Sequence, residues 1–211
     1  TDYFGYSVAI SGNRVVVGAH NEGDSAGGYY SGKVYIFDVN TGGLLTTLSN
    51  PNAYSTSDTD YFGHSVAISG NRVVVGAYGE DDAGGLTSGK AYIFDATTGS
   101  LLHTLHNPNA YGTPANDQFG LSVAIDGNRV VVGAPDEDDA GGTNSGKAYI
   151  FDATTGSLLR TLHNPNAYGT SDTDNFGTSV SISGTNVIVG AYSEDDAGGT
   201  YSGKAYFYQI P

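Results

Sequence analysis

The chain of 211 residues contains no cysteine, methionine or tryptophan, and only 8 basic residues stand against 22 acidic ones, a formal charge of −14. The missing cysteine excludes disulfides, thiolate metal sites and thiol nucleophiles. The negative charge repels phosphates and anionic headgroups, so we expect no nucleic-acid partner. No apolar run approaches the ~20 residues of a membrane-spanning helix, so we expect no membrane insertion.

The residues that are abundant favour turn-rich β structure over helix. There are 32 glycines and 16 tyrosines. Glycine is common where chains turn, and tyrosine is common in strands. The length allows one sizeable domain with its own core.

The chain consists of four copies of one unit. The dipeptide Phe-Gly recurs in each copy, and Ser-Gly-Lys recurs every 57 residues, ending at Lys33, Lys90, Lys147 and Lys204. The repeats therefore span approximately residues 1–57, 58–115, 116–172 and 173–211.

Each of the first three units contains four strand signals separated by turn signals, which in the first unit are 7–10, 14–19, 33–37 and 44–48. The second is continuously apolar, so both of its faces should be buried, whereas the fourth mixes Leu with Thr and should be the half-exposed outer strand. Four short antiparallel strands per repeat are typical of propeller blades. The sequence therefore predicts an all-β fold, a single β-propeller domain of four-stranded antiparallel blades over residues 1–211.

The last unit lacks the Leu-Leu-x-Thr-Leu strand, and the chain begins in the linker of the first unit. Four blades can close a ring, but exposed strand edges also invite pairing with another chain. A closed four-bladed disc, a fragment of a longer propeller, half of an eight-bladed dimer and an edge-to-edge polymer all remain open at this point.

The repeated motif resembles the FG-GAP repeat family, known from the propeller of integrin α-subunits and from bacterial extracellular proteins. Its Phe-Gly half stands at Phe4-Gly5, Phe62-Gly63, Phe119-Gly120 and Phe176-Gly177. The Gly-Ala-Pro half is complete only at Gly133-Ala134-Pro135. The resemblance implies an extracellular or cell-surface propeller that commonly binds calcium and mediates adhesion or recognition, usually without catalysis.

The family's calcium loop, Asp-x-Asp-x-Asp-Gly between the first two strands, is absent, because that connection here is only a short turn. Acidic residues instead follow the second strand and precede each Phe-Gly. In an up-and-down blade these two segments leave from the same face, while Arg14, Arg72 and Arg129 start strands at the other. Carboxylates in glycine-rich loops suit Ca²⁺, although solvated surface acids are the alternative. The candidate ligands are Glu22, Asp24, Glu80, Asp81, Asp82, Asp136, Glu137, Asp138, Asp139, Glu194, Asp195, Asp196, Asp58, Asp60, Asp117, Asp172 and Asp174.

Three other features, the P-loop-like runs, the histidines and the tyrosines, give weaker indications of function. The Gly-rich runs that end at the four Ser-Gly-Lys lysines match the start of a P-loop, but a strand follows instead of a helix, so nucleotide binding is not expected. The five histidines are expected at surfaces or edges. Tyr35, Tyr92, Tyr149 and Tyr206 should pack between blades. Tyr54, Tyr111 and Tyr168 could stack on sugars, but packing of the linkers is favoured.

The sequence thus predicts a non-catalytic, calcium-associated extracellular module for recognition, adhesion or surface scaffolding. Its expected partner is a protein or glycan at a surface, with self-association through open blade edges as a further expectation. The alternatives are a lectin-like glycan-binding module, a self-assembling structural subunit and the non-catalytic propeller part of a larger secreted hydrolase.

Overall fold

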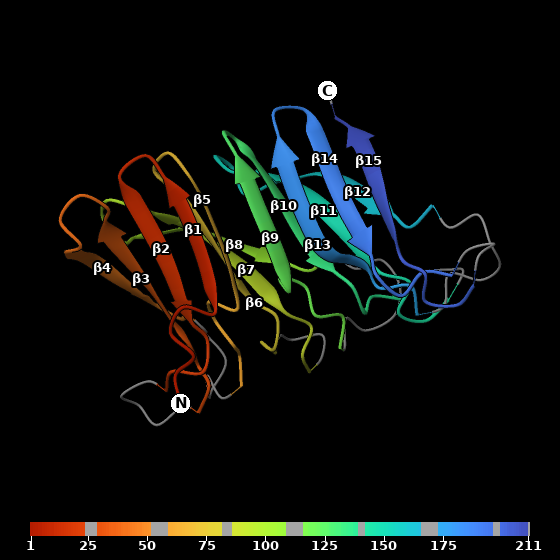
Figure 1. Ribbon diagram of the computed structural model, residues 1–211, viewed down its shortest axis with the longest axis horizontal. Helices are drawn as coiled ribbons and strands as arrows, with labels where there is room; N and C mark the ends of the chain where they lie inside the picture. The colour runs from red at the N-terminus through yellow and green to blue at the C-terminus, as the bar shows by residue number, and fades with distance from the viewer. Residues whose placement is uncertain are drawn as a thin grey trace.

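The computed structural model describes residues 1–23, 29–51, 59–81, 86–108, 116–138, 142–165, 173–195 and 199–210. Throughout these ranges the regular elements are antiparallel strands, grouped in four sheets of consecutive strands (Figure 1). Each sheet lies within one repeat, and we refer to the sheets as the first to fourth blades.

The first blade consists of β1 (Ser7–Ser11), β2 (Arg14–Ala19), β3 (Lys33–Asp38) and β4 (Leu44–Ser49). The second consists of β5 (Ser65–Ser69), β6 (Arg72–Ala77), β7 (Lys90–Asp95) and β8 (Leu101–His106). The third consists of β9 (Ser122–Asp126), β10 (Arg129–Ala134), β11 (Lys147–Asp152) and β12 (Leu158–His163). The fourth consists of β13 (Phe176–Ser183), β14 (Asn186–Ala191) and β15 (Lys204–Gln209).

The predicted blade architecture is confirmed, including the three-stranded fourth blade. Sequence order is also spatial order, and the first strands of neighbouring blades lie against one another, as β1 does with β5 and β5 with β9. The valine-rich second strands β6 and β10 are buried on both faces beyond their first residue, as their continuous apolar sequence predicted. The outer strands β4, β8 and β12 start exposed and bury one leucine each.

The cores lie between blades, because the second and third blades each bury one face against the blade before and the other against the blade after. The face toward the preceding blade, here the leading face, is aromatic: in the second blade it presents Phe62, Tyr92 and Phe94. The face toward the following blade, here the trailing face, is aliphatic and presents Val74 and Ile93. Alternation along the strands produces these two different faces from one sheet.

The repeated glycines allow neighbouring blades to approach closely. Gly120, in the third Phe-Gly, has a left-handed φ of 93°, which favours glycine. Its carbonyl accepts a hydrogen bond of 2.8 Å from the Ser65 hydroxyl of the second blade. That carbonyl also occupies the space that a side chain at Gly76 would need. The Phe-Gly and Gly-Ala dipeptides are therefore two sides of one blade-to-blade contact.

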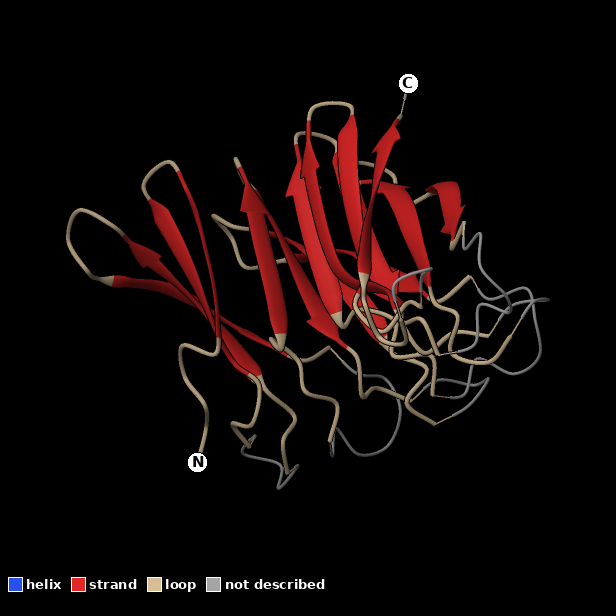
Figure 2. Ribbon diagram, turned by 45° about the vertical axis from the view of Figure 1, so that its right-hand side comes forward, coloured by secondary structure: helices blue, strands red, loops and turns tan. Residues whose placement is uncertain are grey.

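The blades form an open arc. The first and fourth blades lie at opposite ends of the row in both views (Figures 1 and 2). Large apolar side chains of both end blades are exposed, including Phe4 and Phe207. The chain therefore does not close on itself as a four-bladed disc.

Candidate functional site

The acidic segments gather at one end of the blades, here the loop end. The segment before each Phe-Gly runs beside the loop of the preceding blade. Tyr61 donates its backbone N–H to Tyr30 at 3.0 Å, and Phe62 donates to Ser31 at 3.2 Å. The same pairing joins 116–119 to 86–88 and 173–176 to 143–145. The prediction that the two acidic segments share one face is confirmed.

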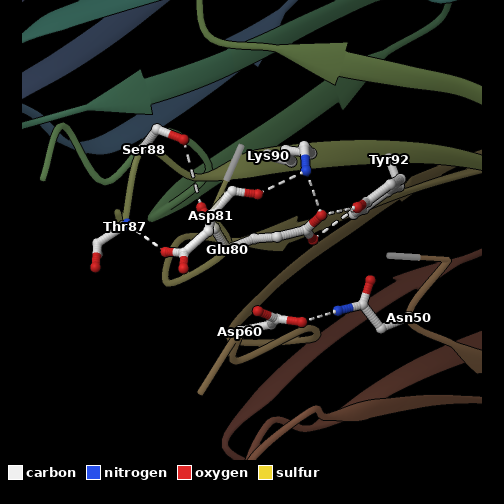
Figure 3. A network of polar contacts seen from close by, with 8 residues as sticks. All are labelled: Asn50, Asp60, Glu80, Asp81, Thr87, Ser88, Lys90 and Tyr92. Carbon is white, nitrogen blue, oxygen red and sulfur yellow. Dashed lines mark hydrogen bonds and ion pairs between the residues drawn. The ribbon is translucent and has the colours of Figure 1, made fainter. Parts of the chain in front are cut away.

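At the loop end, the glutamate after each second strand forms an ion pair with a lysine. The Glu80 carboxylate accepts hydrogen bonds of 2.6 Å from both Lys90 Nζ and the Tyr92 hydroxyl (Figure 3). Glu137 forms the same contacts with Lys147 and Tyr149. Both pairs are almost inaccessible, with Glu80 0% and Lys90 3% exposed. Each loop is therefore fastened to the third strand of its own blade.

Burial raises the pKa of Glu80 and Glu137, and the bonds from lysine, tyrosine and asparagine oppose that rise. Burial and the neighbouring glutamate raise the pKa of Tyr92 and Tyr149, so both hydroxyls stay protonated and donate. The lysine supplies the positive charge that a cation would otherwise bring.

The end blades repeat this ion pair with more exposure. Glu22 and Lys33 are 2.7 Å apart and are 21% and 24% exposed. Glu194 is buried beside Lys204 at 2.8 Å, but Lys204 is 25% exposed. All four predicted glutamate ligands are thus bound to lysine. The sequence signal is the recurrent Lys-x-Tyr of the third strand, which the sequence reasoning did not connect to the glutamates.

Three of the predicted aspartates connect neighbouring blades. Asp60 is buried and accepts a bond of 2.7 Å from Asn50, which follows the outer strand of the first blade (Figure 3). Asp117 with Asn107 and Asp174 with Asn164 repeat this contact at the same distance. Each of these asparagines precedes a proline, so the recurrent Asn-Pro dipeptide is the sequence signal for this contact.

The other described aspartates organise loop backbone or polar side chains. Asp81, Asp138 and Asp195 each accept a backbone amide through Oδ1, from Thr87, Asn144 and Tyr201 respectively. Asp136 accepts bonds from Gln118 at 2.7 Å and Asn175 at 2.8 Å, and burial raises its pKa. The predicted ligands Asp24, Asp58, Asp82, Asp139, Asp172 and Asp196, and the tyrosines Tyr54, Tyr111 and Tyr168, lie outside the described residues.

Across the described ranges, no three acidic or histidine side chains are grouped closely enough to hold a metal ion. The calcium prediction stays a prediction. In the same ranges, no helix is long and apolar enough to cross a membrane.

An aromatic cluster lies at the loop end of the first two blades. It comprises Tyr3, Tyr6, His20, Tyr30, Tyr61, His64 and Tyr78. Tyr61 stacks between Tyr30 at 6.0 Å and Tyr78 at 5.1 Å between ring centroids. Tyr3, Tyr6 and Tyr30 are exposed. The cluster therefore presents aromatic faces to solvent beside acidic loops.

The histidine prediction was wrong for His20, which is buried in this cluster with its ring 5.3 Å from that of His64. Burial lowers the pKa of His20. Burial, assisted by the charge of His20, lowers the pKa of His64 to about 4. Of the described polar atoms, the Nδ1 atoms of both rings are buried without a hydrogen-bond partner. The pair is therefore neutral at physiological pH.

The third and fourth blades carry mostly other residues at the equivalent positions. Gln118 and Asn175 replace Tyr3 and Tyr61, and Leu121 and Thr178 replace Tyr6 and His64. The asymmetry is notable in a chain whose repeats otherwise agree closely. It distinguishes one half of the loop end from the other.

Backbone conformation does not follow this contrast, because the positions of Tyr30 and Tyr61 hold left-handed φ in every blade. Tyr30 and Tyr61 both hold left-handed φ, 58° and 55°, and Asn144 and Asn175 hold it at the same positions of later blades. Asparagine tolerates this conformation much better than bulky residues do. Thr87, Gln118 and Tyr201 hold it at the equivalent positions as well, so the strained backbone is a property of the repeat and not of the aromatic cluster.

Tyr92, Tyr149 and Tyr206 belong to or pack against the cores between blades, as expected, but Tyr35 belongs to none of these cores. Tyr92 and Tyr149 are buried between blades, and their rings lie 5.8 Å from those of Phe62 and Phe119. Their packing role is confirmed. The bonds to Glu80 and Glu137 are an addition that the sequence analysis missed.

The arginines lie at the opposite end, as predicted. Arg14 donates to the Thr97 hydroxyl of the next blade at 2.9 Å, and Arg72 donates to Thr154 at 3.0 Å.

The family model described as FG-GAP repeat matches residues 1–37, 53–94, 110–151 and 166–208, once in every blade. No curated protein matched the chain.

Proposed function

We propose that the chain, which belongs to the FG-GAP repeat family, is a non-catalytic recognition module that works outside the cell or at its surface. Propellers of this family are generally non-catalytic and typical of extracellular proteins. The binding surface in this proposal is the loop end of the first two blades. The observation that carries it is the aromatic cluster.

The chemistry of the loop end supports binding over catalysis. The buried glutamates at this end are held in ion pairs with lysine, and the buried aspartates accept bonds from asparagine. A general acid or base needs a carboxyl group within reach of a substrate. The exposed groups of the aromatic cluster are instead tyrosine rings, which contribute contact area at little entropic cost.

A glycan is the ligand class that the cluster favours. Tyr3, Tyr6 and Tyr30 are exposed, so the apolar face of a sugar can stack on their rings. Carboxylates of the acidic loops at this end can accept hydrogen bonds from its hydroxyl groups. A protein ligand at a surface, the adhesion function that the family resemblance implies, is the other candidate.

Binding to a glycan array distinguishes a glycan ligand from a protein ligand. We expect binding by the wild-type chain and loss of at least about tenfold in affinity for Tyr30→Asn with Tyr61→Asn, the residue that later blades carry there. Tyr201→Asn is the matched control, because Tyr201 stands at the position of Tyr30 in the fourth blade and is exposed. Binding that survives the double change would exclude the cluster as the site, and an array without hits would favour a protein ligand.

Calcium is a separate part of the proposal. With the glutamates paired to lysine, the described residues that would contribute ligands are Asp81, Asp138 and Asp195, one in each of three blades, whose Oδ1 atoms accept a backbone amide. Carboxylate oxygen is the donor that Ca²⁺ prefers. Bound ions would neutralise charge and stiffen the loops of the second to fourth blades.

A further inference from the structure

We propose that the leading face of the first blade docks on the trailing face of the fourth blade of a second copy, so that two copies close into one eight-bladed ring. The proposal is independent of the ligand proposed above. It concerns the two ends of the arc and not its loop end.

The leading face of the first blade exposes the side chains that later blades bury. Phe4 is 58% exposed, while Phe62, Phe119 and Phe176 are each 0%. Val8 and Ile10 of β1 are 65% and 64% exposed, whereas Ile68 and Ile125, the equivalents of Ile10, are buried. Phe4 already packs on Tyr35 and Phe37 with the geometry of Phe62 on Tyr92 and Phe94. The face is preformed and lacks only a preceding blade.

The trailing face of the fourth blade is exposed in the complementary way. Ile188 is 40% and Phe207 is 78% exposed. They stand where the second blade has Val74 and Ile93, both 0% exposed against the third blade. The side chain of Phe207 is larger than the isoleucine of other blades, and it lies on β15, the outermost strand of its sheet. Exposed apolar surface of this kind marks an interaction site.

The three contacts inside the chain are the template for the fit between these faces. In each, a serine hydroxyl of one blade donates to the Phe-Gly carbonyl of the next, as Ser7 does to Gly63 at 2.7 Å, Ser65 to Gly120 at 2.8 Å and Ser122 to Gly177 at 2.7 Å. Ser179 stands at this donor position in the fourth blade, and Gly5 stands at the acceptor position in the first.

A second polar contact repeats in the same way. The backbone N–H of a turn glycine donates to a side-chain oxygen of the preceding blade, from Gly70 to Ser11, Gly127 to Ser69 and Gly184 to Asp126. The end faces retain both groups, Gly12 in the first blade and Ser183 in the fourth. Apolar and polar partners are thus available for a fourth contact of the same type.

The second copy follows from the difference between the two faces. The leading face with Phe4 and the trailing face with Ile188 and Phe207 are different surfaces, so their contact is heterologous and closes into a ring or continues as a filament. Propellers typically have four to eight blades. Two copies give eight, three would exceed that range, and one copy leaves its ends apart (Figure 1).

Sedimentation equilibrium of the 211-residue chain tests the proposal. At about 50 µM we expect a mass of twice 21.7 kDa. Val8→Asp on the leading face and Phe207→Asp on the trailing face should each weaken the dimer about 30-fold or more, as at interface hot spots. Leu86→Asp is the control, because Leu86 is 69% exposed in a loop of the second blade, and it should leave the mass at the dimer value.

Mixing the two variants distinguishes the proposed contact between a leading and a trailing face from other modes of dimerisation. The Val8→Asp and Phe207→Asp chains retain one intact face each, so a mixture should form mixed pairs joined by one contact, although neither variant pairs alone. Melting curves close to that of the monomeric wild type would show that both variants fold. A strict monomer, as expected if other repeats of a longer chain cover these faces, would overturn the proposal. So would dimers that either variant forms alone, or filaments in place of a pair.

Discussion

The inner blades, which are the second and third, and the outer blades, which are the first and fourth, carry nearly the same residues but differ in solvent exposure. Phe119 and the Glu137–Lys147 pair of the third blade are buried on all sides, whereas Phe4 and the Glu22–Lys33 pair of the first blade face solvent. The residues and their local contacts agree, but the neighbouring blade is missing. In this repeat array the environment of a residue is decided by the next blade as much as by its own.

Truncating the phenylalanine that recurs in every Phe-Gly should give the largest contrast between inner and outer blades. Phe119→Ala leaves a cavity between two blades and should lower the free energy of unfolding by about 3–5 kcal/mol. Phe4→Ala removes a half-exposed ring and should cost the monomer about 1 kcal/mol or less. Urea unfolding at low protein concentration measures both. Equal losses would contradict the account of where the core lies.

The ion pairs should give the next contrast. Lys147→Met leaves Glu137 buried without its cation and should cost about 3 kcal/mol. Lys33→Met acts on a partly exposed pair and should cost about 1 kcal/mol or less. Adding Glu137→Gln to Lys147→Met should recover part of the loss, because no buried charge then remains. If the two single variants were equally stable, the Glu137–Lys147 ion pair would not be what holds the loop to the third strand of its blade.

Titration of His64, which is partly buried in the aromatic cluster, should distinguish the first two blades from the last two. Because the pKa of His64 is lowered from 6.5 to about 4, the unfolded chain binds a proton between these values and the folded chain does not. Stability should therefore be full above pH 6.5 and fall by about 1–2 kcal/mol as the pH drops to 4, after allowance for partial exposure.

His64→Leu, which copies Leu121 of the third blade, should flatten this part of the pH profile. His106→Leu, at an exposed position at the end of β8, is the control and should leave it unchanged. A profile that keeps its slope in His64→Leu would assign the effect to another group.

Calcium should give the smallest effect, and it should depend on loops of the second to fourth blades. The first blade has Gly23 where these blades have Asp81, Asp138 and Asp195. Saturating calcium should raise the melting temperature by about 2–4 °C, or about 1 kcal/mol. The three Asp→Asn changes together should abolish the rise, and Asp126→Asn at the opposite end should not. Identical melting in calcium and chelator would refute the calcium proposal.

The sequence was sufficient to predict the blades because its signals are local and occur four times. The 57-residue period, the valine-rich second strands and the glycine turns predict strands and their order without tertiary information. The missing outer strand of the fourth blade was equally visible. The open arc could not be predicted, because ring closure depends on the angle between blades, which no local pattern encodes.

The site was predictable only in its location. Connectivity placed both acidic segments at the loop end, but the glutamates and aspartates differ in partners that are distant in sequence. Glu80 meets Lys90 and Tyr92 across a loop, and Asp60 meets Asn50 from the preceding blade. The aromatic cluster was missed because its tyrosines and histidines stand at separate repeat positions, and only their deviation from the other repeats could have revealed them.

Cross-linking in this cysteine-free chain would test most directly whether the leading face of the first blade docks on the trailing face of the fourth blade of a second copy. Arg14 contacts Thr97 across the first blade-to-blade contact, and the equivalent positions of the end faces are Asn186 of the fourth blade and Asn40 of the first. A mixture of Asn40→Cys and Asn186→Cys chains, treated with a short bis-maleimide, should give a covalent pair of about twice 21.7 kDa, and neither variant alone should do so. No mixed product, or a product from Asn40→Cys by itself, would contradict the account.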